Sequence, residues 1–389
     1  MMNDNYFHIP QLAKRKAKAK RFKFIAMMAL VASVSFLVFF LSDMIIKGHG
    51  AFTQTYVKIP VHINEKTAKF THKSIDRKEY GFAVSRAWLR GLKKTLKNNP
   101  EWMNTNQERW ALANSNVDQF IKGKYNRLKP KQIQKIKQMQ KDGKVERRFN
   151  NIFFEKGDSK IPEFSGFMAS IVGTVMTMLI TMLIAVPLGV MTAIYLEEFA
   201  KDNKFTQILE VNINNLAAIP SILFGLLGLA VFINFFGVPR SSPLVGGMTL
   251  ALMSLPVIIV SSKAALKSVP DSIRQAGFAL GLTKWQIVRD HVLPIAMPGM
   301  LTGAIIALAQ AMGETAPLIM VGMIAFIPDI SSSFLDATTV MPAQIFTWSG
   351  MPERAYIERT AAGILVLLGI LLSLNAIAIY LRKKYTKTW

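Results

Sequence analysis

Cysteine is absent from this chain of 389 residues, and histidine occurs only five times. The absence of cysteine excludes a disulfide scaffold, an iron–sulfur cluster and thiolate chemistry, and the scattered histidines predict no metal site. Acidic residues are also scarce, because 24 Asp and Glu stand against 47 Lys and Arg, which gives a formal net charge of +23. Yet 51% of the residues are hydrophobic and the mean hydropathy is +0.28. This combination excludes a disordered basic chain and argues against an ordinary soluble enzyme.

Long apolar runs explain the high mean hydropathy. A bilayer core about 30 Å thick needs ~20 helical residues. Six runs are long enough and carry at most one charge, and we therefore predict an all-α polytopic membrane protein with six transmembrane helices. Prolines inside the longer runs, including Pro187, Pro220 and Pro317, predict broken or tilted pieces there. The six runs are residues 24–42, 166–196, 211–239, 241–262, 292–327 and 360–381.

The positive charge divides the chain into regions. Short loops on the side of the N-terminus hold 18 Lys and Arg, against three on the other side, which predicts that both termini are cytoplasmic. No small-x-small cleavage site follows the first run, so an uncleaved anchor is predicted in preference to a signal peptide. The predicted regions are a basic cytoplasmic N-terminus (1–23), a first transmembrane helix (24–46), an extracytoplasmic insert (47–165), a membrane core (166–382) and a basic cytoplasmic tail (383–389).

The insert carries a net charge of +15 and contains no membrane-length run. Alternating residues predict a strand over 53–63, which Pro60 places at a sheet edge. Residues 78–97 and 101–148 are predicted to be mainly helical, with a small core of Trp88, Trp102 and Trp110. Nucleic acid is not an expected partner of an exported segment. Two interpretations stay open: a solvated accessory domain, or a field that attracts an anion or an acidic protein.

The loop at 268–294 contains signals for two short helices. Ser268-x-x-Asp271 and Thr283-x-x-Gln286 are capping-box patterns, and Gly281 is a helix stop between them. The pattern predicts a helix–Gly–helix unit beneath the membrane, with a simple connector as the alternative. Trp285, Val288 and Val292 are expected on one face, with Lys284 and Arg289 facing water.

The fifth run combines small residues with one carboxylate. Gly299, Gly303, Ala307, Ala311 and Thr315 recur every four residues, which predicts close helix packing. Glu314 is the lone charge in the run, and a charge in the bilayer is costly unless it faces a partner or a water-filled path. Gln310 precedes Glu314 by one turn, and Pro317 opens the helix next to it.

Two motifs resemble known families. Gln275-Ala276-Gly277-x-x-x-Gly281, followed by His291-x-Leu293-Pro294, is similar to the EAA-xxx-G-x9-I-x-LP loop of ABC importer permeases, with Gln, Gly and His at three motif positions. Residues 309–318, AQAMGETAPL, resemble the ARAxGETAPL signature of phosphate ABC permeases of the PstA type, as do 185–199 and 219–226. The resemblance covers residues ~165–382 and leaves out the insert. It implies that the loop docks on an ATP-binding subunit through Arg274, Gln275, Ala276, Gly277, Gly281, Lys284 and Trp285.

The resemblance also implies a fold and a function. The fold would be that of a type I ABC importer permease in a bacterial inner membrane, forming half of a path for inorganic phosphate by alternating access. The implied partners are a PstC-like second permease, two PstB-like ATP-binding subunits and a PstS-like phosphate-binding protein. This chain has no G-x-x-x-x-G-K-[ST] loop, so it is expected to be no enzyme, to hold no cofactor, and to leave ATP and Mg to partner subunits.

Gln310 occupies the position of the family's membrane Arg, which leaves two roles for Glu314. Glu314 either lines the path, with a cation from another subunit, or holds the helix break or a subunit interface. Ser221 and Thr315 are candidate anion donors along the path. Three further readings stay open: transport of another oxyanion, a self-sufficient secondary transporter or channel, and a membrane enzyme or anchor that acts through its insert.

Overall fold

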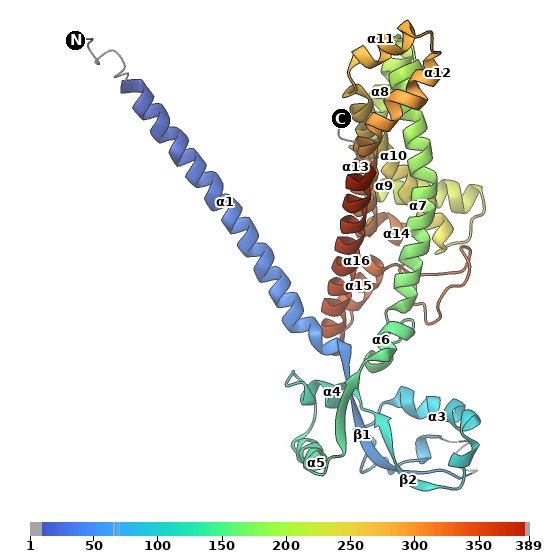
Figure 1. Ribbon diagram of the computed structural model, residues 1–389. Coiled ribbons are helices and arrows are strands. Elements are labelled where there is room, and N and C mark those ends of the chain that lie inside the picture. The colour runs from blue at the N-terminus through green and yellow to red at the C-terminus, as the bar shows by residue number, and fades with distance from the viewer. Residues whose placement is uncertain (1–9, 65–66, 68, 70, 386–389) are drawn as a thin grey trace.

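The computed structural model describes residues 10–64, 67, 69 and 71–385. Parts of the predicted N-terminal segment (1–9) and of the tail (386–389) lie outside these residues. Figure 1 shows a bundle of long helices with a smaller sheet-containing unit at one end. The helices of the bundle are α1 (Pro10–Gly48), α7 (Met168–Ile194), α8 (Lys204–Leu216), α9 (Ser221–Leu227), α10 (Pro243–Lys267), α13 (Leu293–Gly313), α14 (Ala316–Met320), α15 (Met341–Ser349) and α16 (Ala355–Tyr385).

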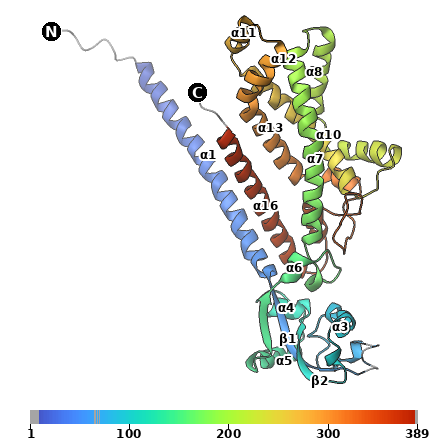
Figure 2. The same cartoon turned by 45° about the vertical axis from the view of Figure 1, so that its right-hand side comes forward.

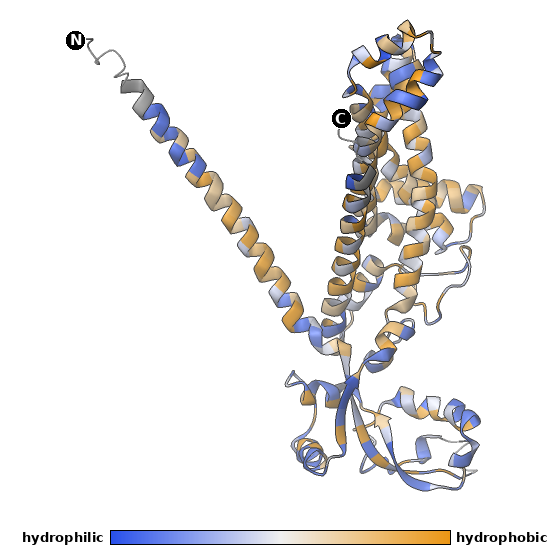
Figure 3. Ribbon diagram, viewed as in Figure 1, coloured by the Kyte–Doolittle hydropathy of each residue, from blue (hydrophilic) through white to orange (hydrophobic). Residues whose placement is uncertain are grey.

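Five helices in the described residues are long and apolar enough to cross a membrane, and a bent pair makes a sixth span. Figure 3 shows apolar residues along these helices, whereas hydrophilic residues concentrate in the end unit and in the opposite tip. The prediction of six spans is therefore confirmed when the bent pair counts as one. That pair is α8 with α9 and the π-helical segment η7 (Gly228–Phe235), and its two arms differ by 106°.

The break in this third span follows from Pro220. Pro220 precedes the first residue of α9, has a φ of −54°, and offers no N–H to continue a helix from α8. The run at 211–239 is thus two arms and not one straight helix. Pro187 behaves differently, because it lies inside the continuous α7.

Small residues bring the central helices together. A side chain at Gly247 of α10 would lie 2.6 Å from Ile180 of α7, and one at Gly189 would lie 2.7 Å from Ile258. From the first of these contacts to the second, the residue numbers increase in both helices, so α7 and α10 run parallel. α13 packs antiparallel to α10, because Gly299 faces Ala265 and Gly303 faces the earlier residue Ser261.

α1 leaves the bundle at an angle and meets α16 near the insert, as Figures 1 and 2 agree. Gly48 allows this crossing, since a Cβ there would lie 2.8 Å from the Ala362 nitrogen. Further along α1, large apolar side chains are exposed; Phe36, for example, is 71% exposed. Such a surface is stable only in lipid or against another protein.

The insert is a mixed α/β unit. Its three antiparallel strands are ordered β2-β1-β3, and the predicted strand at 53–63 is confirmed as β1. The prediction that 101–148 is mainly helical holds for α4 and α5 but misses β2 and most of β3, and the helix expected over 78–97 begins only at Arg86. The elements are β1 (Thr53–His62), α3 (Arg86–Asn98), β2 (Asn106–Leu112), α4 (Ser115–Ile121), α5 (Pro130–Lys141), β3 (Val145–Phe149) and α6 (Asn151–Glu155).

β1 is the central strand, which corrects the expected edge position. β3 pairs with β1 only from Thr53 to Val57, and the Lys58 nitrogen still donates to Lys144 at its end. Pro60 lies two residues after Lys58, so its backbone nitrogen faces the β3 side of β1, as that of Lys58 does. At Pro60, however, β3 has already ended. Its missing N–H therefore costs no ladder bond, which is how a central strand tolerates this proline.

The core of the insert forms between the sheet and its helices. Val57, Ile59 and Leu92 are at most 1% exposed, and Trp88 and Trp102 pack against this cluster as predicted. Trp110 does not belong to it, which corrects the third member of the predicted aromatic core. Its ring lies under the Arg148 guanidinium, 4.9 Å from ring centre to Cζ.

Buried charges join the insert to the membrane core. Glu358 of α16 accepts a hydrogen bond from Gln119 of α4 at 2.5 Å and pairs with Lys122 at 3.1 Å. The side chains of Glu358 and Lys122 are each only 4% exposed, and Lys124 lies 3.3 Å from the same carboxylate. Loss of these partners would leave a buried, unpaired carboxylate and strongly destabilise the fold. The contacts therefore fix the insert relative to α16.

Candidate functional site

The loop between α10 and α13 folds into two short helices at the end of the bundle opposite the insert (Figure 1). α11 (Asp271–Ala279) ends before Gly281, whose φ of +78° lies in the left-handed region that favours glycine. Thr283 and Gln286 form the predicted capping box at the start of α12 (Lys284–Ile287). The helix–Gly–helix unit is therefore confirmed.

One predicted cap is wrong. α11 begins after Pro270, which provides no side-chain cap, and the Ser268 hydroxyl instead donates to the Ala265 carbonyl. Ser268 still has helical backbone angles at the end of α10, so its side chain turns back along its own helix. The Ser-x-x-Asp pattern therefore spans the junction between two helices and does not cap the second.

Gly277 fixes the packing within the unit. An added Cβ would lie 2.6 Å from Cγ1 of Ile287, so only glycine lets α11 approach α12 this closely. Ile287, Val288 and Val292 are buried, as predicted for the two valines. Trp285 is not buried with them, because 52% of the residue is exposed, and its ring lies 6.4 Å from that of Phe199.

Arg274 ties the loop to the first helix of the core. Its guanidinium donates to Glu198 Oε1 at 2.6 Å, and to the Val269 and Leu266 carbonyls at 2.8 and 3.1 Å. Glu198 belongs to the π-helical turn η6 (Tyr195–Phe199) that ends α7. The hydrogen bond to Glu198 raises the pKa of Arg274 above its usual value. Arg274 thus acts within this chain, as a brace of the loop.

Other predicted docking residues face outward. Gln275 and Ala276 are exposed on α11, and the Lys284 ammonium lies 5.6 Å from the Phe199 ring centre. Phe278 and Leu280, on the same loop as Trp285, are 53% and 79% exposed, and sequence reasoning missed them. The sequence could have indicated them, because large apolar residues at the end of a short polar helix are often exposed for contact with a partner. Together with Trp285 they are the exposed large apolar residues of the loop, called its apolar surface below.

The break predicted in the fifth span falls at Glu314. α13 ends at Gly313, Glu314 adopts an extended backbone with ψ of 132°, and α14 begins two residues later. Among the described residues, no hydrogen bond or ion pair to the Glu314 carboxylate is found. Gln310 is exposed one turn earlier. The lone membrane carboxylate and its neighbouring amide are therefore both without partners inside the described part of the chain.

Ser221 and Thr315 are brought to the same region by helix packing. A Cβ at Gly225 of α9 would lie 2.7 Å from Pro317, so α9 lies directly against α14. Ser221 is the first residue of α9, one turn from Gly225, and Thr315 precedes the first residue of α14. Both predicted anion donors thus lie at helix starts around the break.

The small-residue row is confirmed for helix packing, with one correction. Gly303 faces Ser261 of α10 so closely that any Cβ would overlap its hydroxyl, and Ala307 and Ala311 are buried. Thr315 does not continue the row, because α13 has already ended at Gly313.

Comparison with known proteins decides the family. A family model described as "binding-protein-dependent transport system inner membrane component" matches residues 185–387, more than half of the chain. The chain belongs to this family. Permease subunits of this kind are membrane components and not enzymes, and the predicted multi-pass class is confirmed. A domain of unknown function (DUF3333) matches residues 10–80, across α1 and the first part of the insert.

Individual relatives carry more specific names. The phosphate transport system permease protein PstA 1 of Mycobacterium tuberculosis (strain H37Rv) is 31% identical over 218 residues, which are 56% of this chain and 70% of that protein. The phosphate transport system permease protein PstA of Yersinia pestis is 30% identical over 227 residues, 57% of this chain and 74% of that protein. An inward-facing MetNI methionine ABC transporter chain superimposes with a TM-score of 0.44 at 18% identity, over 56% of this chain and 95% of that chain.

Proposed function

We propose that this chain is a permease subunit of an ATP-driven importer of inorganic phosphate. The observation that carries the proposal is the similarity to the PstA proteins over more than half of this chain, and the GETAPL segment of the membrane core supports it. The helix break at Glu314, with Ser221 and Thr315 nearby, supplies a polar point at membrane depth in this core. Broken helices of this kind commonly line transporter sites.

The energy would come from partner subunits. Two PstB-like subunits would bind ATP and Mg, a PstC-like permease would complete the path, and a PstS-like protein would deliver phosphate. The apolar surface of Phe278, Leu280 and Trp285, with Gln275 and Ala276 beside it, would dock on an ATP-binding subunit. Both termini would be cytoplasmic, on the same side as this loop.

The geometry suggests how the loop would transmit motion. Closure of the ATP-binding subunits moves the docked loop, and the Arg274–Glu198 pair passes that movement to α7 as a rigid connection. α7 packs along α10, and α10 along α13, so the movement reaches the break at Glu314. Alternating access would follow from rotation of these helices.

Reconstitution tests the proposal. The chain is assembled in proteoliposomes with its second permease and ATP-binding subunits, and the binding protein is added outside with labelled phosphate. We expect uptake that requires ATP and is not competed by sulfate or a phosphonate. Uptake of a competing oxyanion in place of phosphate would support the alternative substrate, and ATP-independent uptake would refute an ATP-driven importer.

A further inference from the structure

The helix α3 of the insert carries all of its positive charge on one side. Its sequence, RAWLRGLKKTLKN, contains five cations and no acidic residue. With 3.6 residues per turn, the five cations fall within an arc of about 100° around the helix. Leu89, Leu92 and Leu96 are buried and hold a different side of α3 against the core of the insert. The five cations are exposed and form what we call the basic face of α3: Arg86, Arg90, Lys93, Lys94 and Lys97.

The basic face is not neutralised within the described residues. None of its five side chains forms an ion pair or a hydrogen bond there, whereas cations elsewhere in the insert do. Lys135 of α5, for example, pairs with Glu79 at 2.6 Å. Five like charges on one helix face repel one another, and a surface of negative charge beside them relieves this repulsion.

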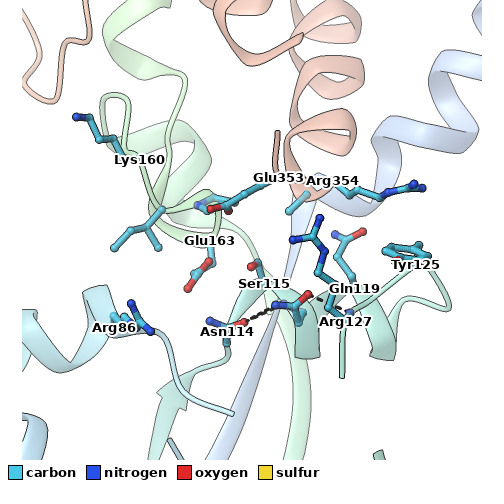
Figure 4. Close-up of a pocket in the computed structure, with 14 residues that line it drawn as sticks. Arg86, Asn114, Ser115, Gln119, Tyr125, Arg127, Lys160, Glu163, Glu353 and Arg354 are labelled. Atoms are coloured by element: carbon cyan, nitrogen blue, oxygen red, sulfur yellow. Dashed lines mark hydrogen bonds between the residues drawn. The ribbon is translucent and has the colours of Figure 1, made fainter. Parts of the chain in front are cut away.

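α3 lies at the junction between the insert and the membrane core. Figures 1 and 2 show it on the side of the insert nearer to the bundle, whereas α5 lies on the far side. Arg86 lines a pocket together with Lys160 and Glu163, which belong to the segment that leads into α7. Figure 4 shows Arg86 on one side of this pocket and that segment on the other. The basic face therefore begins next to the start of a membrane helix.

Lys156 relates the basic face to the level at which α7 begins. The nitrogen of Met168, the first residue of α7, donates to the Lys156 carbonyl at 3.0 Å. Burial and then the positive charge of Lys94 lower the pKa of Lys156, because the two ammonium groups are close. Met168 is also the first residue of an apolar span. The basic face therefore lies near the level at which the hydrocarbon of a bilayer gives way to headgroups.

We propose that the basic face of α3 binds the anionic phospholipid headgroups of the leaflet on the insert's side of the membrane. Headgroups form an extended surface of negative charge, which matches exposed cations spread along one helix and does not require them to converge on one point. The contact gives the insert a second attachment besides its buried contacts with α16. It also assigns a role to part of the high positive charge of the insert.

A lipid surface fits this face better than an acidic protein does. The face lies beside the segment that enters α7, where a bilayer surrounds the end of the bundle. Val175 and Leu179, two to three turns into α7, are 56% and 47% exposed, as expected of side chains that contact acyl chains. An acidic protein that arrives from the aqueous side would first meet the far side of the insert, where α5 exposes lysines of its own.

The absence of cysteine makes a site-specific test possible. Asn98 is the exposed last residue of α3, and N98C introduces the only thiol, which is labelled with a donor fluorophore. The full chain is placed in nanodiscs of phosphatidylcholine with a small fraction of acyl-labelled acceptor lipid, either phosphatidylglycerol or phosphatidylcholine. Energy transfer to the two lipids gives the enrichment of phosphatidylglycerol around α3. A cation near an anionic leaflet corresponds to roughly a fivefold preference, so we expect an enrichment of about fivefold or more.

Two triple variants in the N98C background locate the effect. R90Q/K94Q/K97Q removes three charges from the basic face, and K131Q/K137Q/K141Q removes three exposed charges from α5. We expect the enrichment to fall to about one in the α3 variant and to persist in the α5 control. High salt should also abolish it, because exposed charges are screened. Thermal midpoints should agree among the three proteins, since the substituted side chains are exposed.

Equal transfer to the two lipids in N98C would overturn the proposal, as would unchanged enrichment in the α3 variant or equal losses in both triple variants. Protection of the N98C thiol from a water-soluble reagent only when the PstS-like protein is added, without lipid enrichment, would assign the face to a protein and also overturn it. The measurement needs no transport, so its outcome is separate from that of the proposed function.

Discussion

Arg274 and Glu198 form an ion pair at 2.6 Å across 76 residues of sequence, between the loop that contains α11 and α12 and the end of α7. The Glu198 side chain is only 5% exposed, and that of Arg274 is 18% exposed. The pair therefore connects two elements that have no local sequence relation. It gives the loop a fixed orientation relative to the membrane helices.

Reversing the charge of Arg274 should uncouple the loop from transport. Arg274→Glu places two carboxylates together, and we expect ATP-driven uptake to fall by about tenfold or more, because a charged hydrogen bond is worth roughly 1.5–3 kcal/mol. Glu198→Arg combined with Arg274→Glu should restore part of the uptake. Uptake and ATP hydrolysis are measured on the same proteoliposomes.

Arg289→Glu is the matched control, because Arg289 is exposed on the same loop and pairs only with its neighbour Asp290 in the described residues. We expect it to keep near-normal coupling. Normal coupling in Arg274→Glu would contradict the role of the pair.

The effect of substituting Gly281 should depend on how well the new residue tolerates the left-handed backbone conformation. At a φ of +78°, Gly281→Ala should destabilise the loop by about 1–2 kcal/mol, whereas Gly281→Asn should be milder. Space is not the cause, because no atom lies within 4 Å of the added Cβ. Thermal unfolding and ATP-driven uptake should rank glycine first, asparagine second and alanine last. Any other order would contradict the backbone explanation.

The apolar surface of the loop should be needed for association and not for folding. Leu280 is 79% exposed, so Leu280→Asp should leave the thermal midpoint of the isolated chain nearly unchanged. We expect the variant to lose co-purification with the ATP-binding subunits, because an apolar contact is replaced by a charge. A lower midpoint with intact association would show that this surface is structural.

Glu314→Gln tests the path against a structural role. If the carboxylate acts in the path, phosphate uptake should fall roughly tenfold while the ATP-binding subunits stay bound. Asp329→Asn, an exposed acidic residue elsewhere in the core, should transport normally. Unchanged uptake in Glu314→Gln would leave only a role in the helix break or a subunit interface.

Glu163 should make the stability of the insert junction depend on pH. Because the folded pKa of Glu163 is raised by burial, its neutral form stabilises the fold at acidic pH, and this contribution is lost as pH rises above the ordinary carboxyl range. Glu163→Gln, which is always neutral, should therefore raise the thermal midpoint at alkaline pH and change it little at acidic pH. A wild-type midpoint that rises with pH where Glu163→Gln stays constant would contradict this sign.

The sequence predicted features that depend on local composition. The apolar runs located the spans, Pro220 indicated the break in the third, and Gly281 and Thr283 defined the loop turn. Each is a local effect of hydrophobicity or backbone geometry. Glu314 was likewise found because a single charge in an apolar run is conspicuous.

Other features depend on distant contacts and were missed. β3, with the sequence VERRF, carries adjacent charges and lacks apolar alternation, so only its pairing with β1 makes it a strand. Nothing in the local sequence around Glu198 indicates its pairing with Arg274, which lies 76 residues away. The buried contacts of Glu358 with Gln119 and Lys122 join segments far apart in the chain, which no sequence window contains.

The central position of β1 has a mechanical consequence. β1 follows α1 after one short turn, and its neighbour β3 leads through α6 and the 3-10 turn at Pro162–Phe164 into α7. The ladder between the two strands therefore links the insert-side ends of α1 and α7, the first two spans. If α7 tilts during a transport cycle, the whole insert has to swing with it, and its tip would amplify the movement. One fluorophore on the insert and a second at a fixed reference point would then report this movement as a change in the distance between them.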